Sequence, residues 1–104
     1  MPATTIEGHT IHVNEEGFLT DPREWSEDLA DSLAHQIGID LTEDHWNAIR
    51  FLRQDFAVTN ETATLRRIAV VGGIPTKVMF RLFPQKPAKK AAYVAGLAKP
   101  RGCV

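Results

Sequence analysis

Cys103, the single cysteine of the chain, is the residue whose type and position most strongly suggest chemistry. It is the penultimate residue, it follows Gly102, and Lys99 and Arg101 precede it closely. The thiolate is the reactive form of cysteine, and nearby cations favour it, whereas burial in an apolar core would suppress it. A tail rich in glycine and proline is badly placed to fill a core, so we interpret Cys103 as a reactive thiol on a swinging tail.

The other polar residues do not predict a second reaction centre. A lone cysteine can supply neither a disulfide framework nor a Cys-rich zinc site, and His9 and His12 do not share one side of a strand, so we predict no metal site. No Ser-His-Asp order and no glycine-rich phosphate loop occurs, and we predict no cofactor. We interpret His45, beside Trp46, as a surface or packing residue rather than a catalytic base.

Charge divides the chain into two parts of opposite sign. All 13 acidic residues lie between Glu7 and Glu61 with three arginines, which gives that part a formal charge of −10. The remainder carries nine cations and no acidic residue, so its formal charge is +9. Two interpretations stay open: the basic part binds an anionic partner, either nucleic acid or an acidic protein surface, or the two parts attract each other within the fold.

The length of 104 residues is typical of one globular domain, and so is a composition with 43% hydrophobic and 24% charged residues. No apolar run approaches the roughly 20 residues that a membrane-spanning helix needs. The first residues also lack the basic region and apolar stretch of a signal peptide. We therefore predict a single cytoplasmic domain over residues 1–104, with no membrane contact.

The elements that must position Cys103 begin with a hairpin and two amphipathic helices. An alternating pattern over residues 5–13 and turn residues at 14–17 predict a small β-hairpin whose second strand is at 18–19. An Asp-Pro start and apolar residues at helical spacing predict one helix over 21–38, which a glycine ends. A second helix is predicted over about 42–57.

The basic part predicts three short helices and a mobile end. The helices are expected at about 65–71, 75–83 and 87–95, and the glycine pair between the first two gives a helix-turn-helix outline. Glycines and prolines make residues 96–104 a poor candidate for regular structure, so we predict a flexible C-terminal arm there.

The same outline leaves open a second function of a different class. A DNA- or RNA-binding regulator or adaptor would use the cations Arg66, Arg67, Lys77 and Arg81. The outline is weak evidence, because many helical proteins that never bind DNA contain it. We do not favour nucleic acid as the partner for this reason.

Short motifs across nearly the whole chain carry a family resemblance. In the basic part they are Arg81-Leu-Phe-Pro84, Pro87-Ala-Lys89, Ala95-Gly-Leu97, Lys99-Pro100 and Gly102-Cys-Val104. In the acidic part they are Glu16-Gly-Phe-Leu19, Trp25-Ser-Glu27, Gly38-Ile39, Leu41, His45-Trp46, Arg50-Phe51 and Arg53. With these motifs the sequence resembles the DsrC/TusE family of small sulfur-carrier proteins.

The resemblance implies a mainly α fold: a small helical domain with an N-terminal β-hairpin, a helix-turn-helix unit and a mobile C-terminal arm. It also implies that the penultimate cysteine, here Cys103, carries sulfur as a persulfide. The partners it implies are sulfur-donor and sulfur-acceptor proteins: small sulfur-transfer subunits of the DsrE/TusD type, a tRNA thiouridylase, or complexes of the sulfite-reductase type.

The sequence departs from the family pattern at two places. Members that act directly with sulfite reductase have a second cysteine eleven residues before the penultimate one, and Ala92 occupies that position here. The single-cysteine arrangement is similar to that of the tRNA-thiolation carrier. The stretch from Val70 to Thr76 is also shorter than the family's usual helix-turn-helix segment, which bears on the choice of partner.

From these observations we predict a sulfur relay carrier rather than a stand-alone enzyme. Its role would be in tRNA 2-thiouridine synthesis or in sulfur oxidation. Cys103 is the predicted catalytic residue. The predicted binding residues form a basic surface around the arm, and they are Arg81, Lys86, Lys89, Lys99 and Arg101.

Overall fold

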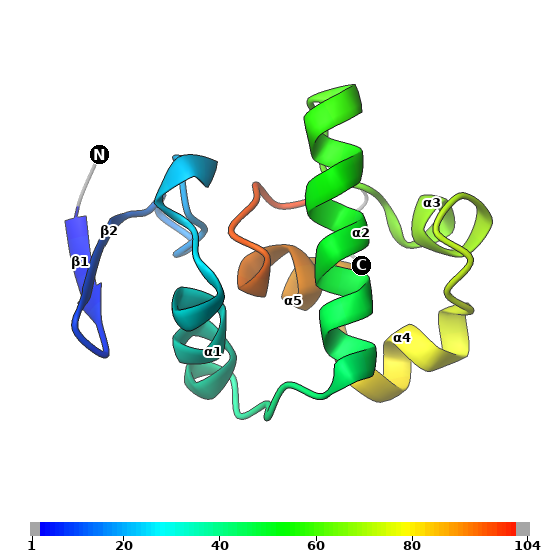
Figure 1. Cartoon of the computed structure of the whole chain (residues 1–104), viewed down its shortest axis with the longest axis horizontal. Coiled ribbons are helices and arrows are strands. Elements are labelled where there is room, and N and C mark those ends of the chain that lie inside the picture. Colours follow the sequence, from blue (N-terminus) through cyan, green and yellow to red (C-terminus); the bar gives the residue numbers. More distant parts are fainter. Residues whose placement is uncertain (1–2, 102–104) are drawn as a thin grey trace.

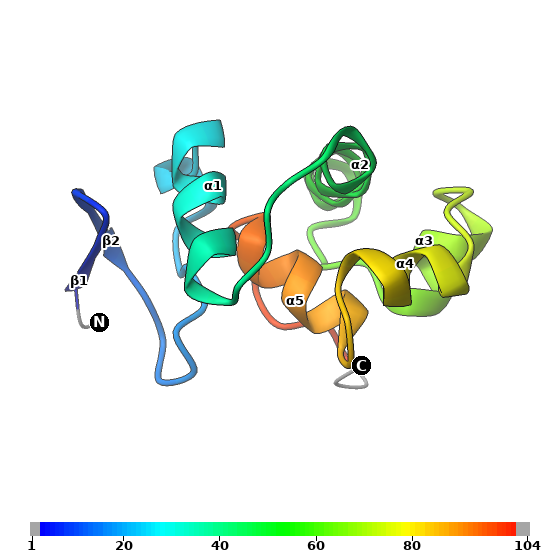
Figure 2. The same cartoon turned by 90° about the horizontal axis from the view of Figure 1, so that it is seen from below.

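The computed structural model describes residues 3–101, and the predicted mainly helical fold with an N-terminal hairpin is confirmed (Figure 1). The described elements are β1 (Ala3–Ile6), β2 (His9–His12), the 3-10 helix η1 (Pro22–Glu24), α1 (Glu27–Gln36), α2 (Glu43–Thr59), α3 (Leu65–Val70), α4 (Thr76–Leu82) and α5 (Pro87–Val94). Figure 2 shows α5 lying between α1 on one side and α4 on the other, below α2.

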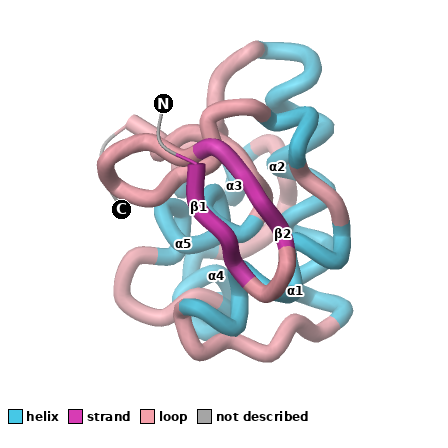
Figure 3. The backbone as a smooth tube through the Cα atoms, turned by 90° about the vertical axis from the view of Figure 1, so that its left-hand side faces the viewer, coloured by secondary structure: helices cyan, strands magenta, loops and turns pink. Residues whose placement is uncertain are grey.

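The hairpin lies closer to the N-terminus than the alternating apolar pattern predicted. β1 and β2 pair antiparallel around Glu7 and Gly8, whose φ values of 47° and 87° are those of a tight two-residue hairpin turn. The predicted turn at 14–17 does form, because the Asn14 side chain accepts the N–H groups of Glu16 and Phe18, but it closes only an isolated bridge between residues 13 and 19. In Figure 3 the two strands lie across the outer side of the helices.

The single helix predicted over 21–38 is wrong in its first turn. Asp21 caps only the three-residue η1, and the chain is extended at Trp25 before α1 begins. The Ser26 side chain accepts the N–H of Leu29 and caps α1 instead. The Trp25 indole donates to the carbonyl oxygen of Val94, 69 residues away, so a tertiary contact interrupts the helix.

The helices pack through one main apolar cluster under α2. Its fully buried members include Ile49 and Leu52 of α2, Ile68 of α3, Met79 of α4 and Val94 of α5. A second, smaller cluster joins the hairpin to α1. Helix α5, whose C-terminal end leads into the predicted arm, therefore packs directly against α1, α2 and α4.

The turn between α3 and α4 is built on the predicted glycine pair. A Cβ at Gly72 would lie 2.6 Å from the Ile68 carbonyl oxygen, and Gly73 has a φ of 70°, which side chains rarely adopt. Pro75 then precedes the first residue of α4. The helix-turn-helix outline is thus present as two short helices packed against each other.

The predicted arm begins on the body and not in solvent. Gly96 has a φ of 72°, its N–H donates to the Tyr93 carbonyl oxygen, and the N–H of Leu97 donates to that of Ala92. This pattern is a Schellman motif, which closes α5 and turns Leu97 into the core. Leu97 and Pro100 are both buried, so the described part of the predicted arm, residues 96–101, contacts the body.

Candidate functional site

Cys103 lies outside the described residues, so the site is built from the residues that lead up to it. We call residues 95–101 the arm base. It leaves the end of α5, passes between α2 and the loop after Leu19, and reaches Arg101, two residues before the cysteine. The side chains around it therefore determine from where the thiol is presented.

Trp25 and Arg53 hold the start of the arm base, and we call these two residues the clamp. Arg53 Nη1 donates to the Ala95 carbonyl oxygen at 2.7 Å, and its Nη2 donates to that of Pro22 at 3.1 Å. The guanidinium also lies 4.1 Å from the centre of the Trp25 ring. Partial burial lowers the pKa of Arg53, and the two carbonyl oxygens and the indole face supply the negative potential that offsets this cost.

Two ion pairs hold the later part of the arm base. Lys99 Nζ lies 3.1 Å from a carboxylate oxygen of Glu16, and Arg101 Nη2 lies 3.4 Å from one of Glu61. The Arg101 and Glu61 side chains are largely exposed, and a pair of that kind contributes little to stability because water screens it. The arm base is thus fixed by buried contacts at its start, and at its end by the buried Pro100 together with these ion pairs.

A cavity of about 300 Å³ lies between the end of α2 and the arm base. Its lining includes the Asp55–Arg67 pair, the last residues of the arm base and Thr62. The Thr62 hydroxyl is buried and has no hydrogen-bond partner among the described residues. Two of the predicted binding residues, Lys99 and Arg101, line this cavity.

A second cavity, of about 440 Å³, gathers the lysines of α5. Lys86 and Lys89 line it, and they are joined by Lys90, whose Nζ donates to the Pro84 carbonyl oxygen at 2.7 Å. Tyr93 lies in the same wall, and burial raises the pKa of its hydroxyl. This cavity also contains Glu16, the carboxylate that pairs with Lys99, so the two groups of cations share a boundary.

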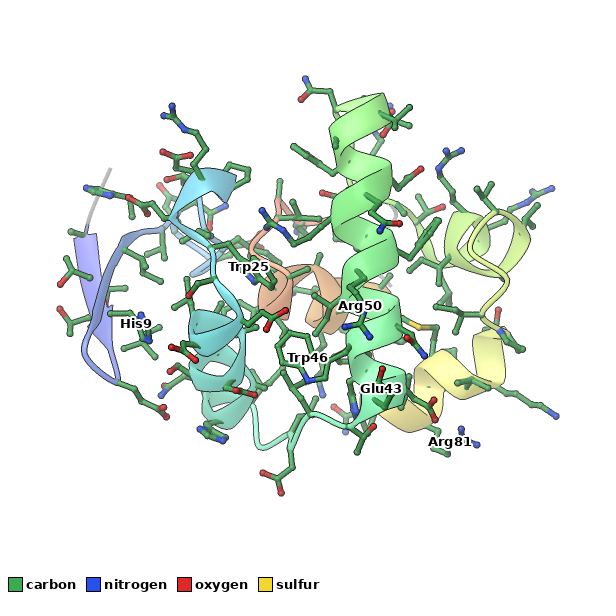
Figure 4. The ribbon with its side chains drawn as sticks, in the orientation of Figure 1. His9, Trp25, Glu43, Trp46, Arg50 and Arg81 are labelled. Atoms are coloured by element: carbon green, nitrogen blue, oxygen red, sulfur yellow. The ribbon has the colours of Figure 1, made fainter. Side chains whose placement is uncertain are left out.

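The five predicted binding residues therefore fall into two groups and one outlier. Lys99 and Arg101 belong to the arm base, and Lys86 and Lys89 belong to the lysine cavity. Arg81 lines neither cavity; it projects from α4 at the end of the molecule opposite His9 (Figure 4).

Arg67, one of the four cations of the nucleic-acid hypothesis, is partly exposed and is paired with a buried carboxylate. Its Nε and Nη2 donate to the two carboxylate oxygens of Asp55 at 2.8 and 2.7 Å. This bidentate pair links α3 to α2, and the guanidinium holds the pKa of Asp55 below its usual range. Arg66, Lys77 and Arg81 are exposed on the helix-turn-helix unit.

His45 is a packing residue, as interpreted. Its Nδ1 accepts the Thr42 N–H at 3.0 Å, which leaves Nε2 as the donor to the Leu82 carbonyl oxygen at 2.8 Å. Its ring meets Phe83 edge to face. The imidazole thus ties the start of α2 to the end of α4, and both of its nitrogens are used.

Trp25 and Arg53 carry no predicted binding or catalytic role, although both belong to the motifs of the family resemblance. An arginine among the apolar positions of a helix, and a tryptophan between two capping residues, were the only local signals for the clamp. Within residues 3–101, no three His, Cys, Asp or Glu side chains come together as metal ligands. In the same part of the chain, no helix is both long and apolar enough to cross a bilayer.

A comparison with protein families matches residues 5–104 to the family described as DsrC like protein. The chain belongs to the DsrC-like family. The match includes Cys103 and the residue after it. The predicted DsrC/TusE resemblance is confirmed.

The sequences most similar to this DsrC-like chain include proteins named Sulfurtransferase TusE. The one from Pectobacterium atrosepticum is 38% identical over 106 residues, which cover 95% of this chain and 97% of that one. The one from Escherichia coli is 34% identical over the same shares.

Solved structures of DsrC proteins have the same fold as this DsrC-like chain. The NMR structure of Allochromatium vinosum DsrC has a TM-score of 0.81 and 35% identity, and the match covers 98% of this chain and 97% of that one. The crystal structure of the oxidized gamma-subunit of the dissimilatory sulfite reductase from Archaeoglobus fulgidus has a TM-score of 0.76 and 35% identity, with 99% and 100% covered. This chain is therefore a sulfur-relay protein of the DsrC/TusE family.

Proposed function

We propose that Cys103 accepts a sulfane sulfur from a donor protein, holds it as a persulfide and passes it to an acceptor protein. The observation that carries the proposal is the position of the chain's single cysteine, next to last in a sequence that the family matches through its final residue. The fixed arm base gives this cysteine a defined point of attachment to the body.

The proposed chemistry is two exchanges at sulfur. The Cys103 thiolate attacks the outer sulfur of a donor persulfide, a new sulfur–sulfur bond forms, and the donor leaves as a thiolate. An acceptor thiolate then attacks the outer sulfur of the Cys103 persulfide and releases the Cys103 thiolate. The transferred sulfur keeps its oxidation state, so neither step requires an oxidant, a reductant or a cofactor.

The predicted cations would act on the partner and on the thiolate. Lys99 and Arg101 are the described cations nearest to Cys103 in sequence, and they would favour its charged form. Lys86 and Lys89, with Arg81 farther away on α4, present positive charge that suits acidic surfaces of donor and acceptor proteins.

We assign the protein to the single-cysteine type of carrier, by analogy with the TusE relatives. Ala92, at the position of the second cysteine in sulfite-reductase partners, is fully buried in α5 and offers no thiol. An intramolecular disulfide with Cys103 therefore cannot form, and transfer between proteins is the remaining route. The partners we propose are small sulfur-transfer subunits and a tRNA thiouridylase in the cytoplasm, with a sulfur-oxidation complex as the alternative.

The test is persulfide formation followed by intact mass. Incubation with a persulfide donor should add one sulfur atom to the wild-type protein, and a reductant should remove it. Cys103→Ser should gain nothing under the same conditions. A wild-type protein that acquires no sulfur from either a polysulfide or a sulfurtransferase donor would contradict the proposal.

A further inference from the structure

Residues from distant segments of the sequence meet where the arm leaves α5. Trp25 lies just before α1, Arg53 lies in the middle of α2, and Leu19 follows the hairpin, yet all three contact residues 94–96. Figure 4 shows Trp25 between the upper end of α1 and α2, directed toward α5. These residues belong to the motifs that carried the family resemblance, and neither cavity nor thiol chemistry explains why they converge.

We propose that Trp25 and Arg53 are positioning residues that hold the start of the arm base as far as Leu97, so that the tether of Cys103 begins no earlier than Leu97 and not at the end of α5. The purpose of this attachment rests on the proposed function, since it concerns how Cys103 reaches a partner. The clamp itself rests on contacts among described residues alone.

The carbonyl oxygens of residues 91–95, at the end of α5, all accept hydrogen bonds. The last carbonyls of a helix lack partners within the helix and normally turn to water. Here the backbone N–H groups of residues 95–97 bond to the carbonyl oxygens of residues 91–93. The Trp25 indole N–H donates to the carbonyl oxygen of Val94, and the Arg53 guanidinium donates to that of Ala95. Side chains from elsewhere in the sequence thus close the helix end where a free arm would leave it open.

The positive charge of Arg53 also suits its place at the end of α5. The C-terminal end of a helix carries partial negative charge, and a cation held there stabilises it. Arg53 places its guanidinium at this end of α5, half-buried and stacked on Trp25, so water screens it less than it screens the two ion pairs farther along. The two contacts of the clamp reinforce each other, because the indole face that attracts Arg53 is held by the bond to Val94.

The backbone at Gly96 also packs tightly against Trp25. A Cβ at Gly96 would lie 2.4 Å from Cδ1 of Trp25, so the backbone of the arm passes directly against the indole ring. Leu97, next along, is 1% exposed and belongs to the main apolar cluster. The chain therefore has one path from Val94 to Leu97, with the clamp on one side and the core on the other.

The start of the tether sets the reach of the thiol. Six residues from Leu97 to Cys103 span at most about 20 Å, and nine residues from Val94 would span about 30 Å. The local concentration of a tethered group falls roughly as the −3/2 power of tether length, so losing the clamp would dilute Cys103 about twofold at a docked partner. A fixed start of the tether also restricts the directions from which the thiol can approach.

The experiment uses the native cysteine, which is the only one in the chain, as the attachment point for a nitroxide spin label. Hydrogen exchange of the Leu97 amide reports the clamp, and paramagnetic broadening of body amides by the label reports the reach of the arm. In Arg53→Gln we expect Leu97 exchange to rise about tenfold or more and broadening to spread over more of the body. Arg53→Lys should restore part of both, since it keeps the charge and loses the two-pronged geometry.

The matched control is Arg50→Gln, because Arg50 lies three residues earlier on α2, is exposed and pairs with Glu43 away from the arm. It should leave both measurements at their wild-type values. Trp25→Phe provides a second variant, since it removes the bond to Val94 and keeps an aromatic ring. It should loosen residues 94–97, and it serves as the test variant where Arg53→Gln does not fold.

The proposal is overturned if Arg53→Gln and Trp25→Phe leave Leu97 exchange and the broadening pattern as Arg50→Gln does. It is equally overturned if exchange rises by the same factor at every core amide, because Arg53 would then be a general stability residue. Loading of unlabelled protein with inorganic polysulfide separates the two proposals. If sulfur uptake is normal and Leu97 amide exchange is unchanged in the variants, only the clamp proposal is refuted. If the wild type takes up no sulfur, the proposed function is refuted and the clamp measurements remain valid.

Discussion

Gly96 shows how one residue links the end of a helix to the geometry of the arm. It occupies the left-handed position of the Schellman motif that closes α5, and the space where its Cβ would lie is filled by Trp25. Gly38 ends α1 with the same motif and the same sign of φ, but nothing lies within 4 Å of its missing Cβ. The two glycines therefore separate the cost of backbone strain from the cost of a clash.

Replacing Gly96 with alanine should destabilise the protein by about 2–4 kcal/mol, through left-handed strain and displacement of the Trp25 ring. Gly38→Ala carries the strain alone and should cost about 1 kcal/mol. Urea unfolding of the two variants measures the difference. Equal losses in the two variants would show that the contact with Trp25 contributes nothing.

The helix boundaries that rest on local chemistry could be predicted from the sequence. The glycines that end α1 and α3, and the prolines that open α4 and α5, act through their own backbone preferences, so their effect is visible in the sequence. The break at Trp25 depends on a carbonyl group 69 residues away, and the hairpin turn depends on Glu7 adopting a positive φ. Neighbouring residues do not encode such features.

The candidate site likewise has one part that could be predicted from the sequence and one part that could not. Cys103 was identified from its type and its place at the chain end, which are properties of the sequence. The clamp, the Glu16–Lys99 pair and the Glu61–Arg101 pair join residues that only the packing of helices brings together. The cysteine could therefore be predicted from the sequence, whereas the side chains that hold the arm base could not.

The link between α2 and α3 predicts how stability depends on pH. Arg67 lowers the pKa of Asp55 in the folded protein, so the stabilisation is fully present above the carboxyl's unfolded pKa, near about 4, and is lost as pH falls through the lower folded value. Asp55→Asn should lower the urea midpoint at neutral pH and flatten its fall between about pH 5 and pH 2. Asp31→Asn, at an exposed position on α1, is the control and should keep the wild-type slope. A wild-type slope in Asp55→Asn would show that the pair does not couple to folding.

At the scale of the whole molecule, the two oppositely charged parts meet, within residues 3–101, at three ion pairs. Arg67, Lys99 and Arg101 pair with carboxylates of the acidic part. Among the described residues, the other six cations of the basic part form no ion pair, so part of the charge stays available to a partner. Those six are Arg66, Lys77, Arg81, Lys86, Lys89 and Lys90.

The proposed relay requires a mobile chain end that carries Cys103 and a rigid body to which this end is attached. We predict backbone order parameters near 0.85 from the helices through Leu97, because Leu97 is buried and its amide is bonded, and values below about 0.6 at Cys103. NMR relaxation of the reduced protein measures both. Uniformly high values to the last residue, together with a thiol that resists alkylation, would contradict the swinging-arm mechanism and leave Cys103 as a packed residue.

The contacts that hold the arm base join residues far apart in sequence, and this constrains the order of folding. The Arg53–Ala95, Trp25–Val94 and Glu16–Lys99 contacts span 42, 69 and 83 residues. Such contacts close large loops, so we expect them to form late, after the local helices and once nearly the whole chain has left the ribosome. A nascent or partly unfolded chain therefore cannot place the arm, and correct presentation of Cys103 marks a molecule that has completed its folding.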